Sequence, residues 1–79
     1  MNTDKLKGIF VEALEITASQ VTNDLTYNSI PEWDSIAHMT LIAEIEDQFD
    51  IMLDTDDVLD MSSFGKAIEI LSKYDISFE

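Results

Sequence analysis

The chain of 79 residues is long enough for one small domain, and its 46% hydrophobic content is too high for a disordered acidic tail. Seventeen acidic residues against four lysines give a formal net charge of −13, which argues against binding to nucleic acids or anionic membrane surfaces. There is no cysteine for disulfides or thiolate metal sites, no apolar run of about 20 residues and no signal-peptide pattern, so we expect a cytoplasmic domain without membrane insertion.

The basic residues stand near the two ends of the sequence. Between Lys7 and Lys66 there are thirteen acidic residues and no basic one. Mutual repulsion at this charge favours a monomer, and it speeds association with basic partners. A surface that is acidic only for solubility has the same composition. The charge alone therefore leaves both interpretations open.

The first element predicted is an amphipathic helix near the N-terminus, with Asn2 or Thr3 as its N-cap. Its apolar residues recur at helical spacing: Leu6, Ile9, Phe10, Ala13 and Leu14. A long loop follows, from Ile16 to Asp34, and loops of more than about 12–15 residues are often functional. Scattered apolar residues are expected to anchor this loop to the core: Val21, Leu25, Tyr27, Ile30 and Trp33. Trp33 could alternatively be exposed and contact a partner.

Three further helices are predicted after the loop. The second runs from Asp34 or Ser35, either of which can cap it, to about Asp50. A short third helix covers Thr55 to Leu59 after a capping Asp54, and the last runs from Ser62 or Ser63 to Lys73. Met52 and Met61 are expected to fill gaps between helices. No stretch alternates like a strand, so the sequence predicts an all-α bundle of three long helices and one short helix, with residues 1–79 as a single domain.

The second helix carries two apolar faces. One is a core-facing stripe formed by Leu41, Ile42, Ile45 and Phe49. The other contains Ile36, Met39 and Ala43, and Glu46 and Asp47 stand at its edge. Apolar residues framed by acids are typical of a docking site, although a central helix buried on two sides would show the same pattern. We favour docking because acidic residues lie among the apolar ones.

Ser35 is the main candidate site residue because it stands where a long loop meets a helix N-terminus. Free N–H groups and the helix dipole favour a phosphate there, although a serine at this position can also be only an N-cap. His38 lies one turn on and could pair with Ser35 as a base, but no orienting partner or oxyanion site is evident. Its angular position lies within the core-facing stripe, so we expect a hydrogen-bonded histidine inside the bundle or lining a pocket.

An acidic run around the short third helix invites a calcium hypothesis. The run consists of Asp54, Asp56, Asp57 and Asp60. Aligned as an EF-hand loop from Asp54, position 6 is Leu59 instead of glycine and position 12 is Gly65 instead of glutamate. No metal site is therefore predicted.

The order of motifs from Asp34 onward resembles the acyl carrier protein family over nearly the whole chain. The matching features are Asp34-Ser35-Ile36 at the start of a helix, the Glu46-Asp47-Gln48-Phe49 ending of that helix, a short acidic helix and a Ser-capped last helix. The resemblance implies a carrier and not an enzyme. Ser35, beside its motif neighbour Asp34, would receive 4′-phosphopantetheine from coenzyme A through a phosphopantetheinyl transferase. The thiol of this arm would then hold acyl groups as thioesters.

The same resemblance implies partners with basic docking surfaces: the transferase, an acyl-loading ligase or acyltransferase, and downstream acyl-processing enzymes. The expected docking residues are Ile36, Met39, Ala43, Glu44, Glu46 and Asp47. Trp33 departs from the small residue usual before the aspartate, and the Trp-Asp-Ser form is similar to carriers of specialised acyl or surface-saccharide pathways. Fatty-acid and polyketide pathways stay open. The alternative is a carrier-like acidic module that is never modified and acts only by binding proteins.

Overall fold

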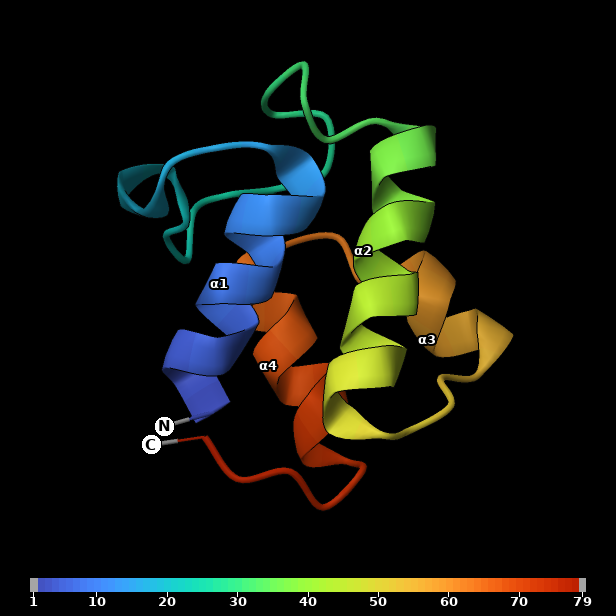
Figure 1. Ribbon diagram of the computed structural model, residues 1–79. Helices are drawn as coiled ribbons and strands as arrows, with labels where there is room; N and C mark the ends of the chain where they lie inside the picture. The colour runs from blue at the N-terminus through green and yellow to red at the C-terminus, as the bar shows by residue number, and fades with distance from the viewer. Residues whose placement is uncertain (1, 79) are drawn as a thin grey trace.

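The computed structural model describes residues 2–78 as helices joined by loops (Figure 1). The helices are α1 (Asn2–Leu14), the 3₁₀ turn η1 (Ala18–Gln20), α2 (Ser35–Phe49), α3 (Thr55–Asp60) and α4 (Phe64–Ser72). Within residues 2–78, extended pairing is limited to one antiparallel bridge between Thr26 and Ser63. The predicted all-α bundle of three long helices and one short helix is confirmed.

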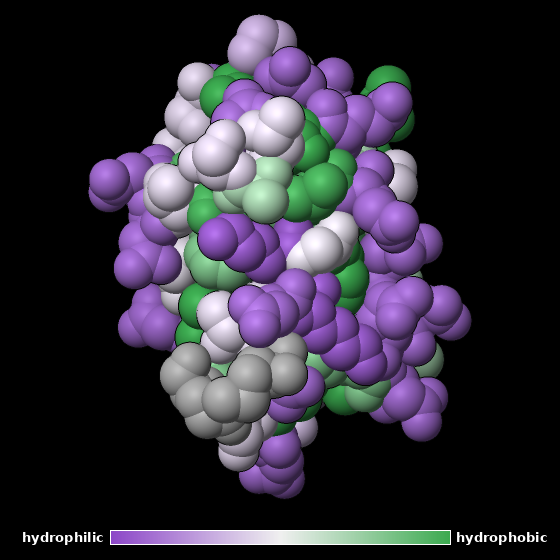
Figure 2. All heavy atoms as spheres, turned by 60° about the vertical axis from the view of Figure 1, so that its left-hand side comes forward, coloured by the Kyte–Doolittle hydropathy of each residue, from purple (hydrophilic) through white to green (hydrophobic). Residues whose placement is uncertain are grey.

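The helices pack around one apolar core. In Figure 1, α1 and α2 lie side by side with α4 behind them, and the short α3 lies against the far side of α2. On the face shown in Figure 2, hydrophilic side chains predominate and hydrophobic ones show only between them. This distribution is expected when each helix turns its apolar stripe inward. None of the helices in residues 2–78 is long and apolar enough to cross a membrane.

Trp33 and Phe10 form the centre of the core. Trp33 is 0% exposed, so it anchors the end of the long loop and is not available to a partner. The Phe10 ring packs edge-to-face against Trp33 at 5.4 Å and against Phe64 at 5.1 Å. These two contacts join α1, the loop and α4 in one aromatic cluster. Val21 and Leu25 are also buried as predicted, whereas Tyr27 remains partly exposed.

Local capping explains where two of the helices begin. The Asp34 side chain accepts a 2.9 Å hydrogen bond from the Ala37 amide at the start of α2, and Ser63 does the same for Lys66 at the start of α4. α2 ends at Phe49, and the following C-cap residue Asp50 adopts the left-handed conformation with φ 54°. The predicted cap of α1 is wrong, because Thr3 lies within a helix that already includes Asn2.

The loop between α1 and α2 is joined to the α3–α4 linker by backbone hydrogen bonds. The Tyr27 amide donates to the Ser62 carbonyl at 2.8 Å, and the Phe64 amide donates to the Leu25 carbonyl at 3.0 Å. These bonds satisfy polar groups that the loop cannot satisfy within itself. The long loop is therefore fixed to the part of the bundle next to the N-terminus of α4.

The short α3 is held to the end of α4 by a polar cluster around Asp57. The Lys73 ammonium lies 2.7 Å from one Asp57 oxygen, and the Tyr74 hydroxyl donates to the other at 2.6 Å. The hydrogen bond from Lys73, followed by that from Tyr74, lowers the pKa of the Asp57 carboxyl below its usual value. Lys73 therefore contacts a specific acid in addition to lying at the C-terminal end of its helix. Met52 is 84% exposed, so its predicted role as a gap-filler is wrong, while Met61 is buried as predicted.

Candidate functional site

Ser35 is the first residue of α2, and its side chain is exposed to solvent. The cap is the preceding Asp34, whose side chain binds the Ala37 amide and whose carbonyl accepts from the His38 amide at 2.8 Å. The Ser35 hydroxyl makes no hydrogen bond to another residue within 2–78. The alternative in which Ser35 serves only as the N-cap is therefore wrong. The Ser35 hydroxyl oxygen is therefore accessible for modification at the N-terminal end of a 15-residue helix.

The N-terminal end of α2 favours a negatively charged group on Ser35. The first amides of a helix have no intrahelical acceptor, and the helix dipole places partial positive charge there. Asp34 is close in sequence, but one of its carboxylate oxygens is held on the Ala37 amide. In Figure 1 this end of α2 lies beside the long loop and away from the chain termini. A phosphate ester on Ser35 would therefore lie within a favourable local field.

His38 is held by hydrogen bonds to two other residues, and it makes none to Ser35 within residues 2–78. The Trp33 indole Nε1 donates to His38 Nδ1 at 3.0 Å, and His38 Nε2 lies 2.9 Å from the Val58 carbonyl oxygen. An indole N–H only donates and a carbonyl only accepts, so the imidazole is neutral with its proton on Nε2. Both ring nitrogens are therefore occupied. The prediction of a hydrogen-bonded, pocket-lining histidine is confirmed, and the Ser/His pair is not formed.

An apolar pocket of about 320 Å³ opens next to Ser35, between α2, α3 and the long loop. Its lining consists of Tyr27, Ser35, His38, Met39, Val58, Leu59, Met61 and Ser62. This volume is at the lower end of the range for small-molecule sites. The His38 hydrogen bond to Val58 crosses from α2 to α3 and fixes the two walls relative to each other. The sequence analysis missed Val58 and Leu59, because nothing in a six-residue helix indicates which residues face a neighbouring helix.

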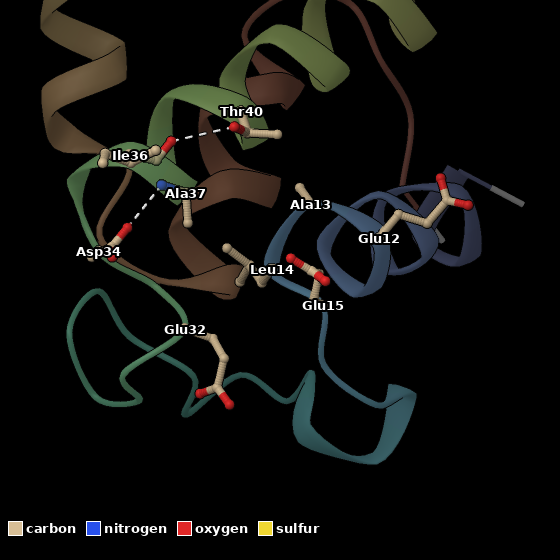
Figure 3. Close-up of a pocket in the computed structure, with 9 residues that line it drawn as sticks. All are labelled: Glu12, Ala13, Leu14, Glu15, Glu32, Asp34, Ile36, Ala37 and Thr40. Atoms are coloured by element: carbon tan, nitrogen blue, oxygen red, sulfur yellow. Dashed lines mark hydrogen bonds between the residues drawn. The ribbon is translucent and has the colours of Figure 1, made fainter.

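A second hollow, of about 630 Å³, lies on the other side of the first turn of α2, against the end of α1 (Figure 3). It is lined by Glu12, Ala13, Leu14, Glu15, Glu32, Asp34, Ile36, Ala37 and Thr40. Two dashed lines in Figure 3 mark the Ala37 bond to Asp34 and the 3.3 Å bond from the Thr40 hydroxyl to the Ile36 carbonyl. Ser35 thus stands between an apolar pocket and a groove with acidic edges.

The outer face of α2 exposes apolar side chains. Ile36 is 79% exposed and Met39 is 60% exposed, and Ala43 and Asp47 are also on the surface. The alternative in which α2 is buried on two sides is therefore wrong. Glu46 is only half-exposed, and its Oε2 accepts a 2.9 Å hydrogen bond from the Leu53 amide. One of the six expected docking residues thus also fixes the loop between α2 and α3.

The acidic run of α3 is part of the fold. Its buried member, Asp57, is bound by Lys73 and Tyr74, and Asp60 lies 3.4 Å from the Lys66 ammonium. Among the residues that the structure describes, no group of three or more histidine, cysteine or acidic side chains is arranged to hold a metal ion. Two of the four carboxylates in this run, Asp57 and Asp60, are therefore directed at lysine and tyrosine partners.

Comparison with known proteins agrees with this geometry. The family described as phosphopantetheine attachment site matches residues 4–71. The acyl carrier protein of Picosynechococcus sp. is 29% identical over 70 residues, which cover 89% of this chain and 86% of that protein. The solution structure of the holo acyl carrier protein from Geobacter metallireducens is 22% identical, with a TM-score of 0.76 over 98% of this chain and 94% of that one, and it shows the same fold. The chain therefore belongs to the acyl carrier protein family, whose prosthetic group is phosphopantetheine.

Proposed function

We propose that Ser35 is the attachment site of 4′-phosphopantetheine and that residues 1–79 act as one carrier domain. The observation that carries the proposal is the position of Ser35 as the first residue of α2, with its side chain exposed and the capping role taken by Asp34. The serine is thus available to a transferase without loss of the helix cap. When bound, the prosthetic group supplies a thiol that holds an acyl group as a thioester.

The residues around Ser35 fit a phosphate ester that carries a flexible arm. Ser35 is the first residue of α2, where the remaining free amides and the helix dipole favour a negatively charged group. The apolar pocket begins at the same residue, with Met39 and Leu59 among its walls. Apolar parts of an arm or of its cargo would be removed from water there. The pocket volume of about 320 Å³ favours a short or partly inserted group.

Within residues 2–78, no side chain is placed to act as a base on Ser35. Both ring nitrogens of His38, the single histidine of the sequence, are engaged by Trp33 and Val58. The base that deprotonates Ser35 is therefore expected from the partner enzyme, a phosphopantetheinyl transferase. We infer that the chain then serves an acyl-loading ligase or acyltransferase and later acyl-processing enzymes, in a fatty-acid, polyketide or other specialised acyl pathway.

We propose that these partners dock on the outer face of α2. Exposed Ile36 and Met39 provide apolar contact, and Asp47 provides charge beside them. Ala43 and Glu44 belong to the same proposed face. We expect Glu46 to contribute less, because one of its carboxylate oxygens already accepts the Leu53 amide.

Intact-protein mass spectrometry tests the proposal. The apo protein is incubated with coenzyme A and a broad-specificity phosphopantetheinyl transferase, beside a Ser35→Ala control. One phosphopantetheine added to the wild type and none to the control would support the assignment of Ser35. Addition to both proteins would contradict it. Absence of addition to the wild type would favour the alternative, a carrier-like acidic module that acts only by binding proteins.

A further inference from the structure

The groove between the end of α1 and the first turns of α2 combines apolar walls with acidic edges. Leu14 and Ala13 from α1 face Ala37 from α2, and the largely exposed Ile36 stands at the side (Figure 3). The acidic residues come from different segments: Glu12 and Glu15 from the end of α1, and Glu32 and Asp34 from the loop before α2. In Figure 3 the Glu15 carboxylate lies on the side of the groove, whereas the Glu12 carboxylate points away from α2.

No basic side chain of the described residues neutralises this groove. The lining contains no lysine. The ion pairs found within residues 2–78 both involve α3, where Lys66 meets Asp60 and Lys73 meets Asp57. Lys5 is engaged elsewhere, since its ammonium donates to the Gln48 carbonyl at 2.7 Å. A hollow lined by charges of one sign concentrates the electric field and attracts the opposite charge.

The apolar and acidic lining fits a side chain that has an aliphatic portion and a positively charged end. Arginine and lysine side chains can lay their methylene groups along apolar surface while the charged head meets carboxylates. The half-buried Ala13 and Ala37 and the exposed Ile36 offer the apolar surface, above the buried Leu14. Glu15 and Glu32 offer carboxylates that make no hydrogen bond or ion pair to another residue within 2–78. A neutral aliphatic side chain would leave these carboxylates without a partner.

The groove also lies where an enzyme acting on Ser35 has to make contact. Asp34 and Ile36, the two neighbours of Ser35 in the chain, both line it. A typical stable interface covers about 800 Å² on each partner, which is a patch of roughly 16 Å radius. The whole molecule measures 30 × 26 × 20 Å. An enzyme that reaches the Ser35 hydroxyl therefore covers the groove as well.

We propose that the phosphopantetheinyl transferase that modifies Ser35 places an arginine or lysine side chain in this α1–α2 groove, between Glu15 and Glu32. The inference rests on the proposed modification of Ser35. It adds a second contact surface, formed by α1 and the loop, to the outer face of α2. The groove supplies charge recognition on the side of Ser35 opposite the apolar pocket.

Steady-state kinetics of a broad-specificity transferase with coenzyme A test the inference. The test variant is Glu15→Gln/Glu32→Gln, which keeps side-chain size and removes two negative charges. The matched control is Glu69→Gln/Asp75→Asn, which removes the same charge from exposed positions on α4 and beyond its end. Asn at position 75 tolerates the left-handed conformation that Asp75 adopts, with φ 65°. Circular dichroism melting of both variants checks that the fold is kept.

We expect the KM of the Glu15→Gln/Glu32→Gln protein to rise about tenfold with kcat little changed, as for the loss of a partly desolvated charge contact. The control should stay within about twofold of the wild type, as for surface charges outside an interface. The kcat/KM of the wild type should fall more steeply with NaCl than that of the test variant.

Two results would overturn the inference while leaving the modification of Ser35 intact. One is an unchanged KM in the Glu15→Gln/Glu32→Gln protein. The other is an equal rise in both double variants, which would show that only net charge matters. If the wild type gains no phosphopantetheine in the same assay, the proposed function fails, and this inference fails with it.

Discussion

The hydrogen-bond relay through His38 predicts a large and specific stability effect. Replacement of His38 by leucine removes the acceptor of the Trp33 indole N–H, which is 0% exposed, and the donor to the Val58 carbonyl. A buried donor without a partner costs about 1–3 kcal/mol, and the second bond adds about 1 kcal/mol. The His38→Leu protein is therefore expected to lose about 2–4 kcal/mol of the roughly 4–12 kcal/mol typical of a chain of this size.

Urea and thermal unfolding measure this loss. Trp33 is the single tryptophan of the chain, and it reports directly on the relay by fluorescence. We expect the melting temperature of the His38→Leu protein to fall by roughly 10–25 °C. The His38→Gln protein is the comparison, because its amide retains both a donor and an acceptor. It should recover part of the loss.

A His38→Leu protein within about 0.5 kcal/mol of the wild type, which is the range of ordinary surface substitutions, would refute the reasoning. It would mean that the indole N–H finds another acceptor or water. The same two proteins also test whether the base that deprotonates Ser35 comes from the partner enzyme. If the His38→Gln protein is folded and is modified on Ser35 at the wild-type rate, His38 is not the base.

Three further outcomes follow from the site and the fold. Met39→Glu should leave the melting temperature within a few degrees and slow transferase modification several-fold, because the exposed Met39 lies on the proposed docking face; unchanged kinetics would contradict that face. Asp57→Asn should reduce the loss of folding stability that occurs as the pH is lowered. The pKa of Asp57 is lowered in the fold by Lys73 and Tyr74, so the unfolded state binds more protons, and the wild type loses this stabilisation as the pH falls below about 4. Urea midpoints at pH 7 and pH 3 should therefore differ more for the wild type than for Asp57→Asn, and equal differences would contradict the assignment. Glu46→Ala should cost about 1 kcal/mol by leaving the Leu53 amide without its acceptor, whereas Glu46→Gln should be nearly neutral in the same unfolding assay.

Features that depend on interactions within one helical turn could be predicted from the sequence. The starts of α2 and α4 fall where Asp34 and Ser63 provide side-chain caps, because a cap depends only on residues within one turn. The core stripe of α2 follows from the spacing of its apolar residues. The position of Ser35 beside a helix N-terminus follows from the same local rules. These local features were sufficient to identify Ser35 as the candidate site residue.

Features that depend on the approach of distant segments were not predictable in this way. The exposure of Met52 depends on how the loop after α2 leaves the bundle, and apolar character alone suggested burial. The Glu46 carboxylate accepts a hydrogen bond from the Leu53 amide. A residue that the sequence predicts only as a docking residue therefore also has a hydrogen-bond partner within the fold. The η1 turn at Ala18–Gln20 has no periodicity to reveal it.

The bonds between the long loop and the α3–α4 linker set an order for folding during synthesis. The Tyr27 amide bonds to Ser62 and the Leu25 carbonyl bonds to Phe64, so the loop that leads into Ser35 has its acceptors and donors only after the start of α4 has been made. A nascent chain that ends before Phe64 can form α1 and α2 but cannot fix the loop between them. The segment that leads into Ser35 is thus fixed only after the start of α4 has been synthesised.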